Sequence, residues 1–327
     1  MLEDLVKRTW MTVAVAMMAS CLPLLAAAQS YPSRPVKIVV PFAAGSGSDI
    51  VGRLLADELR KGFNQSFIVE NKPGGSAQIA AEMVAKAPAD GYTLLLTTNT
   101  AHSANPFLFK TLRYDPVRDF TPVARITYIP YVLVVRPDSG IASTGALVQK
   151  MRANPGKLNY GYGNSTSQVA SAAFVQQGGV DVAAIPYKSM PPVLGDLIGG
   201  RLDFAFVDLT SAHGHIKGGQ LKPIAFTLTK RSSQMPDLPT VAETPGFSGY
   251  EVTSWIGLVG PAGVPRNIVD PLNAELNRIL ARQDIRDKLA ELGAETAPGS
   301  PDDFAAFIRQ QLESWRTKIA AAGIQPE

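Results

Sequence analysis

Strand-like and helix-like segments alternate along this chain of 327 residues, and no other feature constrains its fold as strongly. Short apolar segments rich in β-branched and aromatic residues predict strands at 36–40, 66–69, 93–97, 131–136, 159–162, 182–186, 204–207 and 223–227. Segments with helical periodicity lie between them, at 50–61, 76–86, 143–153, 166–177, 192–199, 265–282, 285–292 and 301–322. This interleaving predicts the α/β class, with a mostly parallel sheet flanked by helices in each domain.

The length predicts two domains, because a single hydrophobic core usually stops growing at roughly 250–300 residues. Two apolar segments, 131–135 and 255–260, have the position expected of crossings between the same two domains. If the chain passes from one domain to the other at both segments, residues 130–255 form one domain. Residues 29–129 and 256–327 together form the other, and a cleft separates the two.

The first 28 residues are typical of a signal peptide. Two basic residues, Lys7 and Arg8, precede an apolar stretch from 10 to 25, which ends in an A-x-A pattern at 26–28. We therefore expect export of a chain that begins at Gln29. The apolar stretch is short and contains Pro23, which disfavours a transmembrane anchor.

The only cysteine, Cys21, lies within this segment, so the exported chain would have no thiol and no disulfide. The sequence before Cys21, Met-Ala-Ser, approximates a lipobox. Acylation of Cys21, which would make the protein a lipoprotein, is therefore the alternative to cleavage after Ala28.

The loop PFAAGSGSDI, residues 41–50, connects a predicted strand to a predicted helix. Ser46 and Asp49 have the spacing of a helix-capping pair, and residues 43–47 have almost no side-chain bulk. A carboxylate could therefore approach main-chain N–H groups at the positive end of the helix dipole. The alternative is a strand-to-helix turn that needs glycine only for its geometry.

Small polar or aromatic residues also follow three other predicted strands, at 99–103, 163–167 and 186–191. In open α/β sheets, ligands bind outside the carboxyl ends of the strands. The recurrence favours a binding site for a small molecule over a simple turn. For Lys188, a solvated surface charge is the alternative to a role in binding.

Sequence patterns of catalysis and of nucleic-acid binding are weak in this chain. The glycine patterns of the nucleophile elbow, of the dinucleotide fingerprint and of the Walker A loop are incomplete. His213 and His215 with Asp208 upstream suggest a metal site but leave it without a clear third ligand, and His102 beside a serine, as in a hydrolase, has no assignable acid. A net charge of +3 without clustered Lys or Arg gives no basic footprint for nucleic acid.

Seven segments, in order, resemble the Bug family, the periplasmic solute receptors of tripartite tricarboxylate transporters. The segments are YPSRPVKIVVPF (31–42), ENKPGG (70–75), ADGYTL (89–94), YDPVRDFTPV (114–123), IPYK (185–188), LPTVAE (238–243) and WIGLVGPAG (255–263). The resemblance runs from residue 31 to the end of the chain.

This resemblance implies a two-domain Venus-flytrap receptor, similar to type II periplasmic binding proteins, that closes on a small carboxylate. It implies a periplasmic location, no catalysis, no cofactor and no metal. It also implies membrane subunits of a tripartite tricarboxylate transporter as partners of a monomeric receptor. A secreted hydrolase acting on carboxylate esters or amides is the alternative from another functional class.

The family pattern, together with the loops described above, gives a set of candidate ligand-binding residues. They are Phe42, Ala44, Gly45, Ser46, Asp49, Thr97, Thr98, Asn99, His102, Gly163, Asn164, Ser165, Ser167, Tyr187, Lys188 and Asp208.

Several positions depart from the family pattern. Ser46 and Ser189 stand where glycine is common, and Val169 stands where many members have histidine. Tyr162 and Met190 would make the second domain's side of the site more apolar, which suits an aromatic carboxylate. The alternative is that both side chains pack against the sheet.

Overall fold

The computed structural model describes residues 31–232 and 234–327, and residues 34–327 form one compact unit. The predicted signal peptide, including Cys21, lies outside the described residues. No helix in the described part of the chain is both long enough and apolar enough to cross a membrane.

Ten strands of this unit form a continuous mixed sheet with the order β2-β1-β3-β9-β4-β7-β5-β6, and β8 and β10 also pair with β4. The strands are β1 (Val36–Val40), β2 (Phe67–Asn71), β3 (Thr93–Thr98), β4 (Phe120–Val135), β5 (Asn159–Tyr162), β6 (Ala183–Pro186), β7 (Phe204–Asp208), β8 (Lys222–Phe226), β9 (Thr253–Pro261) and β10 (Glu295–Thr296). All eight predicted strands are present.

The long strand β4 divides the sheet into two parts. Its residues 120–130 pair with β9, and with β1, β2, β3 and β10 these strands form what we call region A. Its residues 131–135 pair with β7 and β8, and with β5 and β6 these strands form region B. The parallel pairs are β2-β1-β3 in region A and β7-β5-β6 in region B, whereas every pair that includes β4 or β9 is antiparallel. The sheet is thus less parallel than the sequence indicated.

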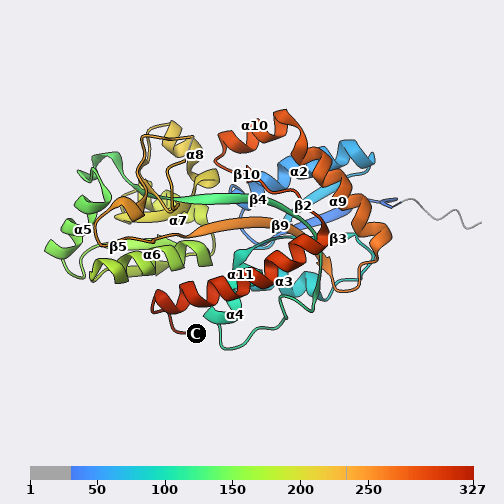
Figure 1. The fold of residues 1–327 in the computed structure, drawn as a ribbon, viewed down its shortest axis with the longest axis horizontal. Helices are drawn as coiled ribbons and strands as arrows, with labels where there is room; N and C mark the ends of the chain where they lie inside the picture. The colour runs from blue at the N-terminus through green and yellow to red at the C-terminus, as the bar shows by residue number, and fades with distance from the viewer. Residues whose placement is uncertain (1–30, 233) are drawn as a thin grey trace, which may run out of the picture. The chain divides into compact units, whose positions relative to one another are not determined.

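Helices cover both faces of the sheet (Figure 1). They are α2 (Gly47–Phe63), α3 (Gln78–Ala85), α4 (Asn105–Leu108), α5 (Thr144–Ala153), α6 (Ser165–Gly178), α7 (Met190–Ile198), α8 (Leu209–Lys217), α9 (Arg266–Ala281), α10 (Gln283–Glu291) and α11 (Pro301–Ala321). The eight predicted helices are present, and α4, α8 and a π-helical turn at Thr100–Ala104 were not predicted. The α/β prediction is therefore confirmed.

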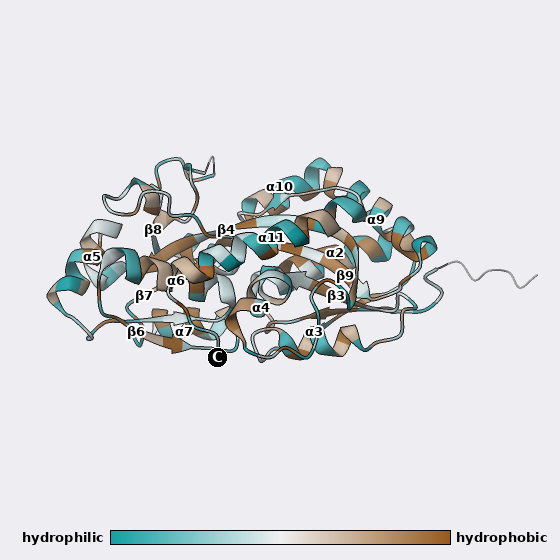
Figure 2. Ribbon diagram, turned by 60° about the horizontal axis from the view of Figure 1, so that its bottom comes forward, coloured by the Kyte–Doolittle hydropathy of each residue, from teal (hydrophilic) through white to brown (hydrophobic). Residues whose placement is uncertain are grey.

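Each region has its own hydrophobic core, and α11 contributes to both. Phe304 and Ile308, near the start of α11, pack in region A around Trp255. Trp315 and Ile319, further along the same helix, pack in the region B core. Figure 2 shows hydrophobic residues along the central strands and a mixture of hydrophilic and hydrophobic residues on the helices. The two regions are thus joined by a shared strand and by a shared helix.

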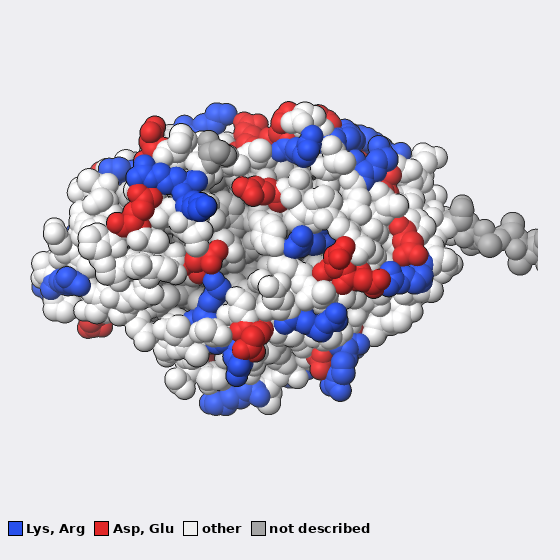
Figure 3. All heavy atoms as spheres, in the orientation of Figure 1, with Lys and Arg blue, Asp and Glu red and all other residues white. Residues whose placement is uncertain are grey.

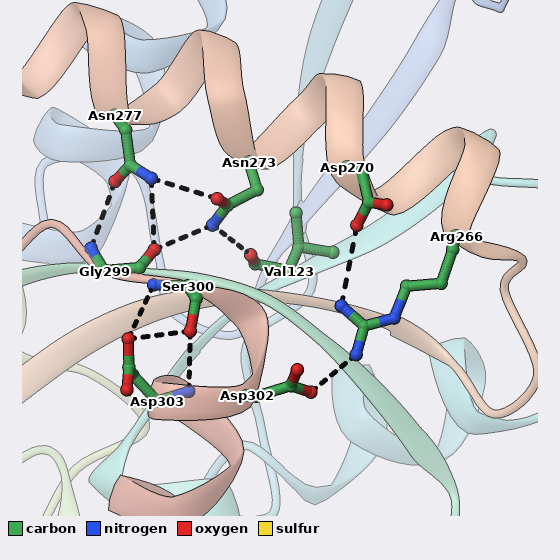
Figure 4. A network of polar contacts seen from close by, with 9 residues as sticks. All are labelled: Val123, Arg266, Asp270, Asn273, Asn277, Gly299, Ser300, Asp302 and Asp303. Atoms are coloured by element: carbon green, nitrogen blue, oxygen red, sulfur yellow. Dashed lines mark hydrogen bonds and ion pairs between the residues drawn. The ribbon is translucent and has the colours of Figure 1, made fainter.

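Two asparagines on α9 fix this helix against region A (Figure 4). Asn273 Nδ2 donates to the carbonyl oxygens of Val123 at 2.8 Å and Gly299 at 2.9 Å. Asn277 Nδ2 donates to Asn273 Oδ1 at 2.9 Å, and Asn277 Oδ1 accepts from the N–H group of Gly299 at 3.1 Å. These amides therefore satisfy backbone groups of β4 and of the turn just before α11 begins.

We expect Asn273→Ala to lower the free energy of unfolding by about 1–3 kcal/mol, because it leaves the buried carbonyl of Val123 without its donor. Chemical denaturation measures this change. The matched control is Asp270→Ala on the same helix, which removes only a solvent-exposed ion pair with Arg266 and should cost less than about 0.5 kcal/mol. Equal effects of the two substitutions would contradict the assignment.

Candidate ligand-binding site

A small cavity lies between regions A and B, at the carboxyl ends of β1, β3 and β7. The space accessible to the centres of water molecules is about 30 Å³. The lining residues come from both regions: Phe42, Ser46, Gly47, Ser48, Thr98, Thr100, Ile129, Tyr131, Asn164, Thr166, Met190, Asp208, Ser254 and Ile256. This is the edge of the sheet at which α/β proteins bind ligands.

The structure brings together at this cavity five of the residues predicted to bind a ligand: Phe42, Ser46, Thr98, Asn164 and Asp208. The wall also contains residues that the sequence did not single out. Ile129 belongs to the first part of β4, and Ser254 and Ile256 belong to β9. The sequence predicted neither of these segments as a strand. Met190, discussed only for its apolar character, also lines the cavity, whereas Tyr162 does not.

The loop at the start of α2 uses three of its N–H groups internally. Ser46 caps the helix, its Oγ accepting from Asp49 N at 3.3 Å. Gly45 N donates to Asp49 Oδ2 at 2.9 Å, and Ser46 N donates to Ala43 O at 3.1 Å. Gly45 has a φ of +80°, a left-handed conformation that favours glycine. The glycine is thus needed for the turn itself, as the alternative interpretation of this loop expects.

Two further N–H groups of the loop bind hydroxyl groups of region B. Ala43 N donates to Ser189 Oγ at 3.1 Å, and Gly47 N donates to Ser211 Oγ at 2.8 Å. A carboxylate could take over these donors, since their present partners are neutral hydroxyl groups of the other region.

Asp208 ends β7, caps α8 and lies against α2. Its Oδ1 accepts from Ser211 N at 2.8 Å and from Ser211 Oγ at 2.7 Å. Burial raises the pKa of this carboxyl above its ordinary value. A Cβ on Gly47 would lie 2.2 Å from Asp208 Oδ1, so the two regions can approach this closely only because residue 47 is glycine.

Asp49 stabilises the loop from behind through hydrogen bonds. Burial opposes its ionisation, but hydrogen bonds from Arg53, from Gly45 N and from Asn71 outweigh burial and lower the pKa of Asp49. Asn71 Nδ2 donates both to Asp49 Oδ1 and to Phe42 O, each at 2.9 Å. The charged carboxylate of Asp49 therefore holds the loop in shape and does not line the cavity.

The residues after β3 have different environments. Asn99 connects the regions, because its Nδ2 donates to Thr166 Oγ1 at 2.8 Å and its Oδ1 accepts from Ser254 Oγ at 2.6 Å. His102 is completely buried, with Nδ1 2.6 Å from Thr97 Oγ1 and its ring against Phe120. Thr97, Asn99 and His102 lie behind the cavity wall.

The turn at the start of α6 is a capping box. Asn164 Oδ1 accepts from Ser167 N at 2.9 Å, and Ser167 Oγ is within 3.3 Å of Asn164 N. Ser165 Oγ donates to Asn105 Oδ1 at 3.3 Å, across to region A. Gly163 packs directly on the backbone of Ser189. In this turn, Ser167 and Gly163 shape the backbone that presents Asn164.

Four predicted residues lie away from the cavity on or near the surface. Ala44, Gly45 and Lys188 are exposed. Tyr187 is half-buried, and its hydroxyl donates to Asp196 Oδ2 at 2.7 Å.

Metal binding finds no support in the described residues, where no three His, Cys, Asp or Glu side chains form a cluster suited to a metal ion. His215 Nδ1 is 2.7 Å from Gln220 Oε1, and His213 lines a separate apolar cavity. Charges of both signs are interspersed on the face drawn in Figure 3.

Comparison with known proteins identifies the family. A family model described as the tripartite tricarboxylate transporter family receptor matches residues 51–324. This chain belongs to that family. Its members are solute-binding receptors, so the receptor is not an enzyme, and the hydrolase alternative is set aside.

Individual relatives cover almost the whole receptor. The UPF0065 protein in the tcbD-tcbE intergenic region of Pseudomonas sp. (strain P51) is 35% identical over 293 residues, 89% of this chain and 87% of the relative. The structure of Rpa4515 from R. palustris with adipate has 36% identity and a TM-score of 0.89, covering 91% of this chain and all of Rpa4515. The periplasmic binding protein BugD has 33% identity and a TM-score of 0.86, covering 91% of this chain and all of BugD. The Bug-family resemblance and the two-domain receptor fold are confirmed.

We expect His102 to make the receptor less stable in acid. Burial lowers the pKa of His102 from 6.5 to about 3, so below pH 6.5 the unfolded chain binds a proton that the folded chain excludes. The free energy of unfolding should fall from pH 7 toward pH 3, by about 2 kcal/mol at pH 5 from this residue alone.

Urea unfolding at pH 7 and pH 5 tests this expectation. His102→Gln should flatten the pH dependence, whatever its effect on stability at pH 7. His215→Gln, which changes a partly exposed histidine, is the matched control and should keep the wild-type slope. A wild-type slope in His102→Gln would refute the prediction.

Proposed function

We propose that this receptor captures a small organic carboxylate between regions A and B and delivers it to the membrane subunits of a tripartite tricarboxylate transporter. The observation that carries the proposal is the pair of N–H groups at Ala43 and Gly47, which donate to hydroxyl groups of region B at the contact between the two regions. A carboxylate that replaced Ser189 and Ser211 would bind at the positive end of α2, where an anion is stabilised. The adipate in the structure of Rpa4515 is consistent with a ligand of this class.

We also propose that the two regions correspond to the two domains predicted from the sequence. Residues 29–129 and 256–327 would form one domain and residues 130–255 the other. In support, β4 changes partners one residue after this limit, since Pro130 pairs with Thr253 of β9 and Tyr131 pairs with Asp208 of β7. Gly47 already lies against Asp208 in the present structure, and an open form of the receptor would separate them.

Binding can be tested by titration calorimetry with citrate, adipate, L-malate, benzoate, phenylacetate and L-aspartate. We expect at least one carboxylate to bind, and Gly47→Ala to weaken its binding at least about tenfold, because the new methyl group prevents the approach of Asp208. Small-angle scattering should show ligand-induced compaction of the wild type and not of Gly47→Ala.

The matched control is Gly214→Ala in α8, where an added Cβ meets no atom within 4 Å. This variant should bind and close like the wild type. Failure of every carboxylate of the panel to bind, or normal closure of Gly47→Ala, would overturn the proposed mode of binding.

We also propose export to the periplasm, the location that the family implies. Mass spectrometry of the protein from its native membrane and periplasmic fractions should find a mature chain that begins at Gln29. A chain that begins at a diacylated Cys21 would show a lipoprotein, and a chain that retains Met1 would contradict export.

A further inference from the structure

A second cavity lies between the same two regions and has Asn164 in common with the first. Its space accessible to the centres of water molecules is about 200 Å³, against about 30 Å³ in the first cavity. Tyr162 and Tyr187 line it at the carboxyl ends of β5 and β6, and Ser76 lines it after β2. We call it the tyrosine cavity. Of the two, only this one is large enough in the present structure for the body of a small organic acid.

Asn164 has a fixed amide orientation at the junction of the two cavities. Its Oδ1 accepts two hydrogen bonds, from Ser167 N at 2.9 Å and from Tyr131 OH at 3.0 Å. Because a backbone N–H can only donate, this network assigns the oxygen, and Nδ2 is the atom left over. Nδ2 has no hydrogen-bond partner among the described residues, so it is a donor available to a ligand.

Aromatic rings form much of the tyrosine cavity. Tyr187 presents its ring rather than its hydroxyl, because the hydroxyl donates to Asp196, which in turn pairs with Arg201 at 2.6 Å. Tyr162 and Phe109 add two more rings. Such walls suit a flat apolar group, since aromatic pairs gain from both buried area and ring geometry.

The negative charge that lines the tyrosine cavity disfavours a ligand with a second carboxylate. Glu327 is the one charged residue among those lining it, and Gln168 is neutral. Burial, and secondly the negative charge of Glu327, raises the pKa of Tyr162. A second carboxylate placed here would meet a negative charge and no cation, which is unfavourable in a partly desolvated site.

We propose that the tyrosine cavity binds the uncharged aromatic end of the ligand, so that the receptor prefers an aromatic monocarboxylate to a linear dicarboxylate. The carboxylate would lie in the first cavity and accept a hydrogen bond from Asn164 Nδ2, and the ring would lie between Tyr162 and Tyr187. This inference rests on the proposed function and adds the chemical class of the substrate.

Titration calorimetry with phenylacetate and adipate tests the inference. The wild type should bind phenylacetate more tightly. Tyr162→Ala should weaken phenylacetate binding about tenfold, and Tyr162→Phe should keep most of the affinity because it keeps the ring. The affinity for adipate should change little in either variant.

A charge substitution gives a second, independent readout. Gln168→Lys should strengthen adipate binding about tenfold and leave phenylacetate binding nearly unchanged, because the new cation pairs with the second carboxylate. Gln168→Met is the neutral control and should keep the wild-type preference. Thermal unfolding of each variant verifies that it is folded.

The outcomes separate the two proposals. Tighter binding of adipate than of phenylacetate by the wild type, or an unchanged affinity for phenylacetate in Tyr162→Ala, overturns the aromatic subsite and leaves the carboxylate receptor intact. Binding of L-malate or L-aspartate, with no binding of phenylacetate or adipate, would also overturn the aromatic subsite and leave the carboxylate receptor intact. Failure of all the carboxylates to bind overturns the proposed function itself.

Discussion

The backbone pairing of β4 holds this receptor together. Along its 16 residues the strand pairs first with β9 and β10 and then with β7 and β8, so that regions A and B share one continuous sheet. The cavity lies beside the point at which the partners change, between Ile129 and Tyr131. Any relative movement of the regions must therefore occur through a twist or bend of β4 and of the segments that cross with it, which places the moving parts next to the ligand.

The contacts across the cavity are mostly between small neutral groups. Ser189, Ser211 and Asn99 form hydrogen bonds to partners in the other region. Each of these bonds adds little to stability, because the same groups would otherwise form hydrogen bonds with water. Such contacts can exchange partners at low cost, whereas a buried ion pair could not. The fixed charges lie behind them, as with Asp49, which keeps its loop in shape through Arg53 and Asn71.

The sequence predicted most helices and strands because their caps and apolar periodicity are local properties. It predicted less of β4, whose first part contains Pro122 and Pro130 and reads as a loop. For the same reason, Ile129 and the residues of β9 were absent from the predicted site. The burial of His102 and the internal use of Gly45 N depend on packing between distant segments, which spacing alone does not encode. The predicted loop at 41–50 lies at the cavity, yet its available donors are at Ala43 and Gly47.

The sharing of α11 between the two hydrophobic cores has a consequence for cooperativity. Phe304 and Trp315 belong to different cores but to one helix, and β4 likewise contributes to both. Loss of either core would expose apolar side chains of α11 and leave part of β4 without its pairing strands. Partial unfolding is thereby penalised, and the calorimetric and van't Hoff enthalpies of the receptor should agree, as in a protein with a single core.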